Sequence, residues 1–175
     1  MEIVNRTISA LRQITVPRYF RTERGFVTEF YCQLTKQLEQ VDLFPANTIL
    51  ETEVQKNRTA HYGLTQRPDL LIHIPIETGL TQNANENNFV VFAFKLGGKP
   101  SRVQSDYEKL EEMFHHLNYE IGIFINIGAY PTTYLESYKG NFKDRIHELS
   151  IATTNGETKI WHSFFLDGEI NSVER

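Results

Sequence analysis

Two charged residues, Asp69 and Lys95, border or interrupt apolar segments of the chain. Asp69 follows Pro68 and precedes a short apolar run, and Lys95 stands inside the apolar segment 89–96. Unpaired ammonium groups are seldom buried, so we expect Lys95 to reach a cleft or to pair with a carboxylate. Residues two apart in a strand share a face, which would put positions 93 and 95 together beside Asp69 on the adjacent strand. A carboxylate and an ammonium group so placed suit the binding of a cation and the stabilisation of developing negative charge. The plain alternative for Asp69 is a cap on the turn that leads into its strand.

Further motifs flank the triplet Ala93-Phe94-Lys95 in a fixed order. They are Glu23-Arg24 at the head of a helix, the acidic strand 50–54, Pro68-Asp69 with His73 four residues after the Asp, Asp106-Tyr107-Glu108-Lys109-Leu110 in a helix, and the apolar strand 119–128. In order and spacing, residues 22–128 resemble small single-domain nucleases of the PD-(D/E)XK superfamily. Members of that superfamily place an Asp at the start of one core strand and a Glu-X-Lys triplet in its neighbour.

The resemblance implies a phosphodiesterase that acts on DNA and depends on Mg²⁺ or Mn²⁺. Asp69, the carboxylate expected at position 93 and the main-chain carbonyl of Phe94 would bind the metal, which keeps several of its waters. The cation would polarise the phosphodiester and lower the pKa of a bound water. Lys95 would be the catalytic cation and Glu23 an additional acid, although the helix dipole alone also favours Glu23 at a helix start.

Ala93 departs from the superfamily pattern, because the triplet should begin with Glu. Either the natural chain carries Glu and Ala replaces it, or the lineage has lost catalysis and kept the fold for binding. We favour replacement, since Asp69, Lys95 and Glu23 are all retained. A third explanation keeps activity through an acid that has migrated to another element, for which the candidates are Glu23, Glu29, Glu51 and Glu53. Without such an acid we expect weak or absent cleavage.

Two residues of the helix that follows the triplet, Gln104 and Tyr107, lie one turn apart. They resemble a Gln-and-Tyr motif that supports the metal site in some exonucleases of the superfamily, with a spacing that is one residue short. Glu51 and Glu53 share one face of their strand, and the plain alternative for both is the solvated face of an edge strand. The six His residues show no ligand spacing.

The formal net charge is -4, which argues mildly against a general nucleic-acid coat. Local basic clusters could still form a narrow positive cleft, and each of these residues could equally be a solvated surface charge. The candidate DNA contacts are Arg24, Lys56, Arg58, Arg67, Lys99 and Arg102.

Hydrophobic periodicity predicts a mixture of helices and strands. The resemblance implies an α/β (α+β) fold with a central mixed sheet flanked by helices. The predicted helices span 4–14, 23–40, 102–116 and 134–148. The predicted strands span 48–56, 69–74, 89–96 and 120–127, with two edge strands near the C-terminus and turns at Asn155-Gly156 and Asp167-Gly168. The core order of helix, three strands, helix and strand is that of the restriction-endonuclease-like fold.

The length of 175 residues suits one domain, with its core at 22–128 and a C-terminal extension at 129–175. Cys32, in an apolar helical pattern, is expected to be buried. The chain has neither a signal peptide nor an apolar run that could span a membrane, so we expect no membrane contact and a cytoplasmic location. The alternative to a nuclease is a catalytically dead module that binds nucleic acid or protein, as a homo-oligomer or a subunit of a larger complex. A third alternative is an interaction subunit that binds no nucleic acid.

Overall fold

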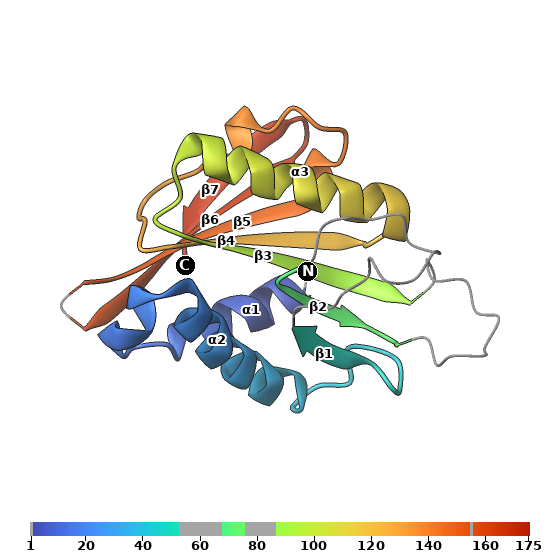
Figure 1. The fold of residues 1–175 in the computed structure, drawn as a ribbon, viewed down its shortest axis with the longest axis horizontal. Coiled ribbons are helices and arrows are strands. Elements are labelled where there is room, and N and C mark those ends of the chain that lie inside the picture. The colour runs from blue at the N-terminus through green and yellow to red at the C-terminus, as the bar shows by residue number, and fades with distance from the viewer. Residues whose placement is uncertain (1, 53–67, 76–86, 155) are drawn as a thin grey trace.

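A computed structural model describes residues 2–52, 68–75, 87–154 and 156–175. In these ranges the chain is α+β, with a mixed seven-stranded sheet in the order β1-β2-β3-β4-β5-β6-β7 (Figure 1). The helices are α1 (Glu2–Arg12), α2 (Glu23–Leu38) and α3 (Pro100–Leu117). The strands are β1 (Ile49–Thr52), β2 (Leu70–His73), β3 (Asn88–Leu96), β4 (Ile121–Ile127), β5 (Ile146–Thr154), β6 (Glu157–Leu166) and β7 (Glu169–Glu174). No described helix has the length and apolar character needed to cross a membrane.

The pairing of neighbouring strands changes across the sheet from antiparallel to parallel and back to antiparallel. β1, β2 and β3 are antiparallel, β3, β4 and β5 are parallel, and β5, β6 and β7 are again antiparallel. Parallel neighbours need a crossover, and α3 makes it between β3 and β4. The C-terminal ends of β3 and β4 therefore lie at one edge of the molecule, near the start of α3 (Figure 1).

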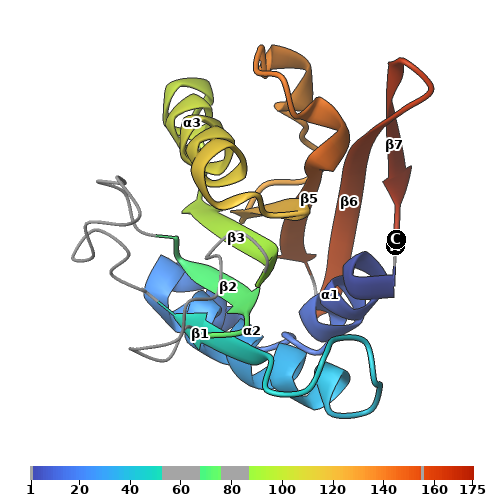
Figure 2. The ribbon, with the colours of Figure 1, turned by 90° about the vertical axis from the view of Figure 1, so that its right-hand side faces the viewer.

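Helices cover both faces of the sheet, with α1 and α2 on one face and α3 on the other (Figure 2). The alternation of side chains along β3 divides the core in the same way. Phe92 and Phe94 pack against Phe30 of α2, with ring centroids 5.7 and 5.4 Å apart. Val91 and Ala93 belong to the cluster under α3. Position 93 therefore faces α3.

The start of α2 is fixed by an N-cap. The side chain of Thr22 accepts a hydrogen bond from the backbone N–H of Gly25, at 3.1 Å. A Cβ atom at position 25 would lie only 2.7 Å from Thr22 Oγ1, so the glycine allows this close approach. The cap makes Glu23 the first residue of the helix.

The predicted helix at 134–148 is wrong. Two short 3-10 turns, Leu135–Ser137 and Lys143–Arg145, occupy part of it, and β5 begins at Ile146. The element order differs from the expected one, because three strands follow β4 in place of a helix and two edge strands. Tertiary pairing decides this segment, since β5 is hydrogen-bonded to β4 and to β6.

Other predicted elements agree in position with the structure, apart from residues 53–56 of the first predicted strand, which lie outside the described ranges. Asp167 and Gly168, both with positive φ, form the two-residue turn between β6 and β7. Asn155 is not described. Cys32 is exposed, contrary to the prediction, because the buried face of α2 is formed by Phe26, Phe30 and Leu34.

Candidate metal and nucleic-acid site

The C-terminal half of β3 extends beyond the start of β2 and meets two carboxylates there. β2 begins at Leu70, which lies opposite Phe92. The N–H of Phe94 donates to Asp69 Oδ2 at 2.8 Å, and the N–H of Leu96 donates to Glu23 Oε2 at 3.0 Å. The N–H and C=O of one strand residue point to the same side, so the carbonyl of Phe94 is directed toward this edge as well.

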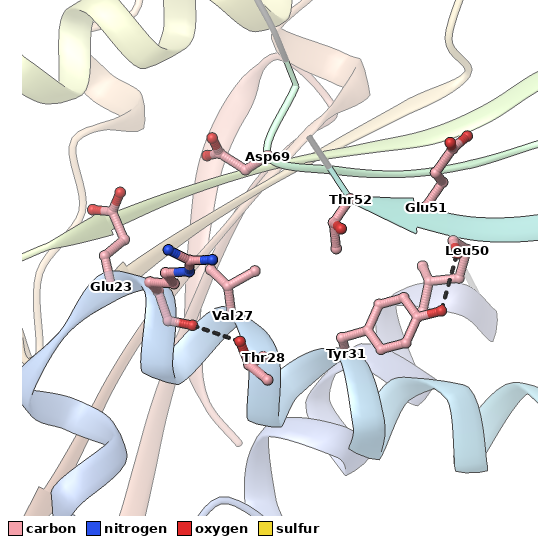
Figure 3. A pocket seen from close by; sticks show the side chains of 9 residues that line it. Glu23, Val27, Thr28, Tyr31, Leu50, Glu51, Thr52 and Asp69 are labelled. Carbon is pink, nitrogen blue, oxygen red and sulfur yellow. Dashed lines mark hydrogen bonds between the residues drawn. The ribbon is translucent and has the colours of Figure 1, made fainter. Parts of the chain in front are cut away.

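Asp69 and Glu23 also line one cavity of about 490 Å³ between α2, β1 and the start of β2 (Figure 3). Burial raises the pKa of Asp69, while the hydrogen bond from Phe94 and the ammonium group of Lys109 lower it. The negative charges of Glu23 and Asp106 raise the pKa further. Burial is the largest of these effects, so the pKa of Asp69 lies above its usual value.

Ala93 is 5% exposed and faces α3. Together with Asp69, Lys109 and other residues it lines a second cavity of only about 10 Å³. The side chain at position 93 is thus next to Asp69, but it is packed beneath α3 and not open to the larger cavity.

Lys95 is paired with a carboxylate, as its position in an apolar strand predicts. Lys95 Nζ lies 3.0 Å from Asp106 Oδ2, and Lys109 Nζ donates to Asp106 Oδ1 at 2.9 Å. Asp106 is 1% exposed. Burial lowers the pKa of Lys109, but the hydrogen bond and charge of Asp106, with the charges of Asp69 and Glu23, outweigh this and raise it.

The charged groups therefore alternate in sign, from Asp69 through Lys109 and Asp106 to Lys95. Lys95 pairs with α3. Asp69 lines the small cavity with Ala93 and also the larger cavity with Glu23, so it lies where both faces of the sheet can be reached. Asp69 is thus not confined to the face opposite Lys95, but the convergence of Asp69, Ala93 and Lys95 on one concave site stays a prediction.

Asp106 and Lys109 are site residues that the sequence prediction missed. Asp106 lies among the buried positions of α3, between Val103 and Leu110. An acidic residue on the apolar face of a helix is a signal that a helical projection could have revealed.

Of the described candidates for a migrated acid, Glu23 and Glu51 line the larger cavity together with Asp69, and Glu29 does not. Glu51 Oε2 pairs with His73 at 2.9 Å, and its carboxylate points away from α2 in Figure 3. Glu29 accepts a hydrogen bond from Gln33 at 2.7 Å. Glu53 lies outside the described residues, so its prediction has no structural counterpart.

Gln104 and Tyr107, the two α3 residues predicted to support the metal site, differ in burial. Tyr107 is buried, and its hydroxyl donates to Glu148 Oε2 at 2.9 Å, away from the Asp69 carboxylate. Gln104 is half-buried.

The predicted DNA contacts are described only in part. Arg24 lines the larger cavity, and Lys99 and Arg102 are exposed at the start of α3. Lys56, Arg58 and Arg67 lie outside the described residues.

The edge of β3 offers oxygen donors of the kind that a hard divalent cation prefers. Within the described ranges, no three His, Cys, Asp or Glu side chains form a metal-binding group. Mg²⁺, however, needs only one or two carboxylates because it keeps several waters. Asp69 and Glu23 each accept a backbone N–H with one oxygen, and the second oxygen of each, with the Phe94 carbonyl, could bind a cation.

No family model, curated protein or solved structure matches the chain.

Proposed function

We propose that the chain is a PD-(D/E)XK-like domain that binds DNA and a Mg²⁺ or Mn²⁺ ion, with phosphodiester cleavage impaired by Ala93. One observation carries the proposal. The carboxylates of Asp69 and Glu23 meet the backbone of β3 at consecutive N–H groups of one strand edge, beside the Phe94 carbonyl. Three segments far apart in the sequence supply these groups.

The residues around this edge have distinct roles in the proposal. Asp69 and Glu23 hold the cation, which when bound polarises a phosphodiester and acidifies water. Lys95 and Lys109, held by Asp106, supply positive charge for the phosphate oxygens in the transition state. Ala93 contributes no carboxylate, so the set of acids is incomplete.

A binding module without catalysis is the second candidate, and the burial of Ala93 favours it. The side chain at position 93 packs under α3, near Leu110 and Met113, in a cavity of about 10 Å³. Position 93 thus serves as part of the core in this chain, and the remaining charges can bind a phosphate backbone without cutting it.

Direct measurement of Mn²⁺ binding tests the metal site without any need for activity. Isothermal titration should detect Mn²⁺ binding by the parent chain and at least a tenfold loss in Asp69→Asn and Glu23→Gln. Both substitutions keep an oxygen that can accept the backbone N–H and remove the charge. Glu29→Gln is the matched control, because Glu29 is also on α2 but does not line the cavity.

Equal Mn²⁺ affinity in all four proteins would contradict the metal site. DNA binding by the parent chain should weaken steeply as salt rises, since counterions compete for the phosphates. Absence of DNA binding at low salt would contradict the nucleic-acid part of the proposal.

A further inference from the structure

The larger cavity extends well beyond the two carboxylates. It runs from Glu23 and Asp69 along α2 to Tyr31, with β1 on its other side (Figure 3). We call this cavity the α2 slot. Its described lining residues are Glu23, Arg24, Val27, Thr28 and Tyr31 of α2, Leu50, Glu51 and Thr52 of β1, and Asp69. The α2 residues recur at helical spacing, so they form one continuous face.

The far part of the α2 slot ends at an aromatic ring. Val27 and Leu50 line it, and Tyr31 Oη donates to the carbonyl of Leu50 at 3.3 Å, which holds the ring across the end of the slot. Thr28 and Thr52 add hydroxyl groups, and Glu51 adds a carboxylate. A volume of about 490 Å³ falls within the usual range of small-molecule sites.

The two ends of the α2 slot differ in chemistry. The end at Glu23 and Asp69 is acidic and suits a cation with its anionic ligand, and Arg24 adds a guanidinium group to the lining. The end at Tyr31 suits the face of a ring, because bases stack on aromatic side chains whatever their identity. A ligand that matches both ends has a phosphate joined to a planar heterocycle.

We propose that the α2 slot receives one unstacked nucleotide, with its phosphate at the Asp69 end and its base against Tyr31. This inference rests on the proposed function and adds the substrate class, which is single-stranded nucleic acid or a frayed end. A paired base must leave its stack to enter, which costs a few kcal/mol, whereas an unpaired base does not have to be separated from a partner.

Fluorescence anisotropy with labelled DNA in Ca²⁺ tests the proposal without cleavage. The ligands are a 12-nucleotide single strand, a blunt duplex whose terminal base pairs are covalently cross-linked so that no base is unpaired, and the same cross-linked duplex with a short overhang. A deoxynucleoside monophosphate serves as competitor and separates a free nucleotide from a strand as the source. The single strand and the overhang duplex should bind at least about tenfold more tightly than the blunt cross-linked duplex.

Two substitutions on α2 give a matched comparison. Thr28→Trp puts a large side chain into the slot, and Thr35→Trp places the same residue outside it. Thr28 and Thr35 are alike in donating their hydroxyl to the carbonyl four residues earlier, at 2.9 Å in both. Thr28→Trp should weaken single-strand binding by about tenfold or more, and Thr35→Trp by less than about twofold.

Tyr31 provides an independent check of ring stacking. Tyr31→Phe keeps the ring and should keep most of the affinity, whereas Tyr31→Leu should lose about tenfold. Thermal denaturation of each variant establishes that it is folded.

The outcomes separate this inference from the proposed function. If all DNA forms bind equally and Thr28→Trp changes nothing, the slot does not take a base and only this inference fails. If no DNA and no nucleotide binds, the proposed function and this inference both fail. If the mononucleotide binds and the strands do not, the slot is supported and a strand substrate is refuted.

Discussion

Asp106 should be among the most sensitive charged positions in the protein. Its carboxylate is 1% exposed and contacts two ammonium groups, Lys95 Nζ at 3.0 Å and Lys109 Nζ at 2.9 Å. Asp106→Asn keeps the shape and removes the charge. Removal of one partner from a buried pair costs roughly 3–5 kcal/mol, because the other charge stays without compensation. The side chains of Lys95 and Lys109 are 20% and 35% exposed and can turn partly to water, so we expect a loss of about 3 kcal/mol.

Thermal and urea denaturation measure this loss. For a protein of this size about 3 kcal/mol corresponds to a fall in Tm of roughly 6–12 °C. Glu108→Gln, an exposed acid on the same helix, is the control and should change the free energy of unfolding by less than about 0.5 kcal/mol. Lys95→Met in the Asp106→Asn background should restore part of the loss. If Asp106→Asn is as stable as the Glu108→Gln control, the reasoning is refuted, since the ion pairs would then only balance the desolvation of the carboxylate.

Three further predictions concern the body of the fold. His147 Nδ1 and His162 Nε2 lie 3.0 Å apart, and burial lowers the pKa of His147 to about 4 and that of His162 to about 3. The unfolded chain takes up these protons near pH 6.5, so the free energy of unfolding should fall by on the order of 3 kcal/mol for either ring as the pH drops from 6.5 to 4. Urea denaturation at several pH values should show this fall in the parent chain and a smaller one in His162→Gln. A parent chain whose stability does not change with pH would contradict the prediction. Glu148 is fully buried and accepts hydrogen bonds from two hydroxyls and two backbone N–H groups. Glu148→Ala should therefore lower the free energy of unfolding by more than about 3 kcal/mol in urea denaturation, whereas a decrease of less than about 1 kcal/mol would show that these donors find other partners. A Cβ at Gly122 would lie 2.6 Å from Phe114 Cζ, so Gly122→Ala should lower the free energy of unfolding by about 1–3 kcal/mol in the same assay. An unchanged free energy of unfolding would show that the Phe114 ring moves aside at no cost.

The elements of the fold were predictable where hydrophobic periodicity is strong. The apolar segment 89–96 predicts β3 because β-branched and aromatic residues favour a pleated, half-buried surface. The segment 134–148 was predicted as a helix because local spacing does not register pairing with remote strands. β5 begins at the end of this segment, its later residues Leu149 and Ile151 pack in the core formed with α1 and α2, and the neighbouring strands β4 and β6 supply the hydrogen bonds.

The candidate site was predictable only in its residue types. Asp69 was identified from the motifs that resemble the nuclease superfamily, and Lys95 also because a charged side chain inside an apolar strand needs a partner. The partners themselves are not local, since Asp69 contacts the backbone of Phe94 and Lys95 contacts Asp106 on α3. Such contacts depend on where β2 begins and how α3 crosses the sheet, which the spacing of residues in the sequence does not specify.

The most direct test of the proposed function is a cleavage assay with Ala93→Glu. Plasmid, linear duplex and single-stranded DNA are incubated with Mg²⁺ or Mn²⁺ and with the parent chain, Ala93→Glu or Ala93→Gln. We predict metal-dependent cleavage by Ala93→Glu and little or none by the other two, because only Ala93→Glu adds a charged carboxylate beside Asp69, with which position 93 shares the small cavity. Lys95→Ala in the Ala93→Glu background should reduce the rate by orders of magnitude. Folded Ala93→Glu protein that binds Mn²⁺ and cuts no form of DNA would contradict the nuclease proposal and favour the binding module.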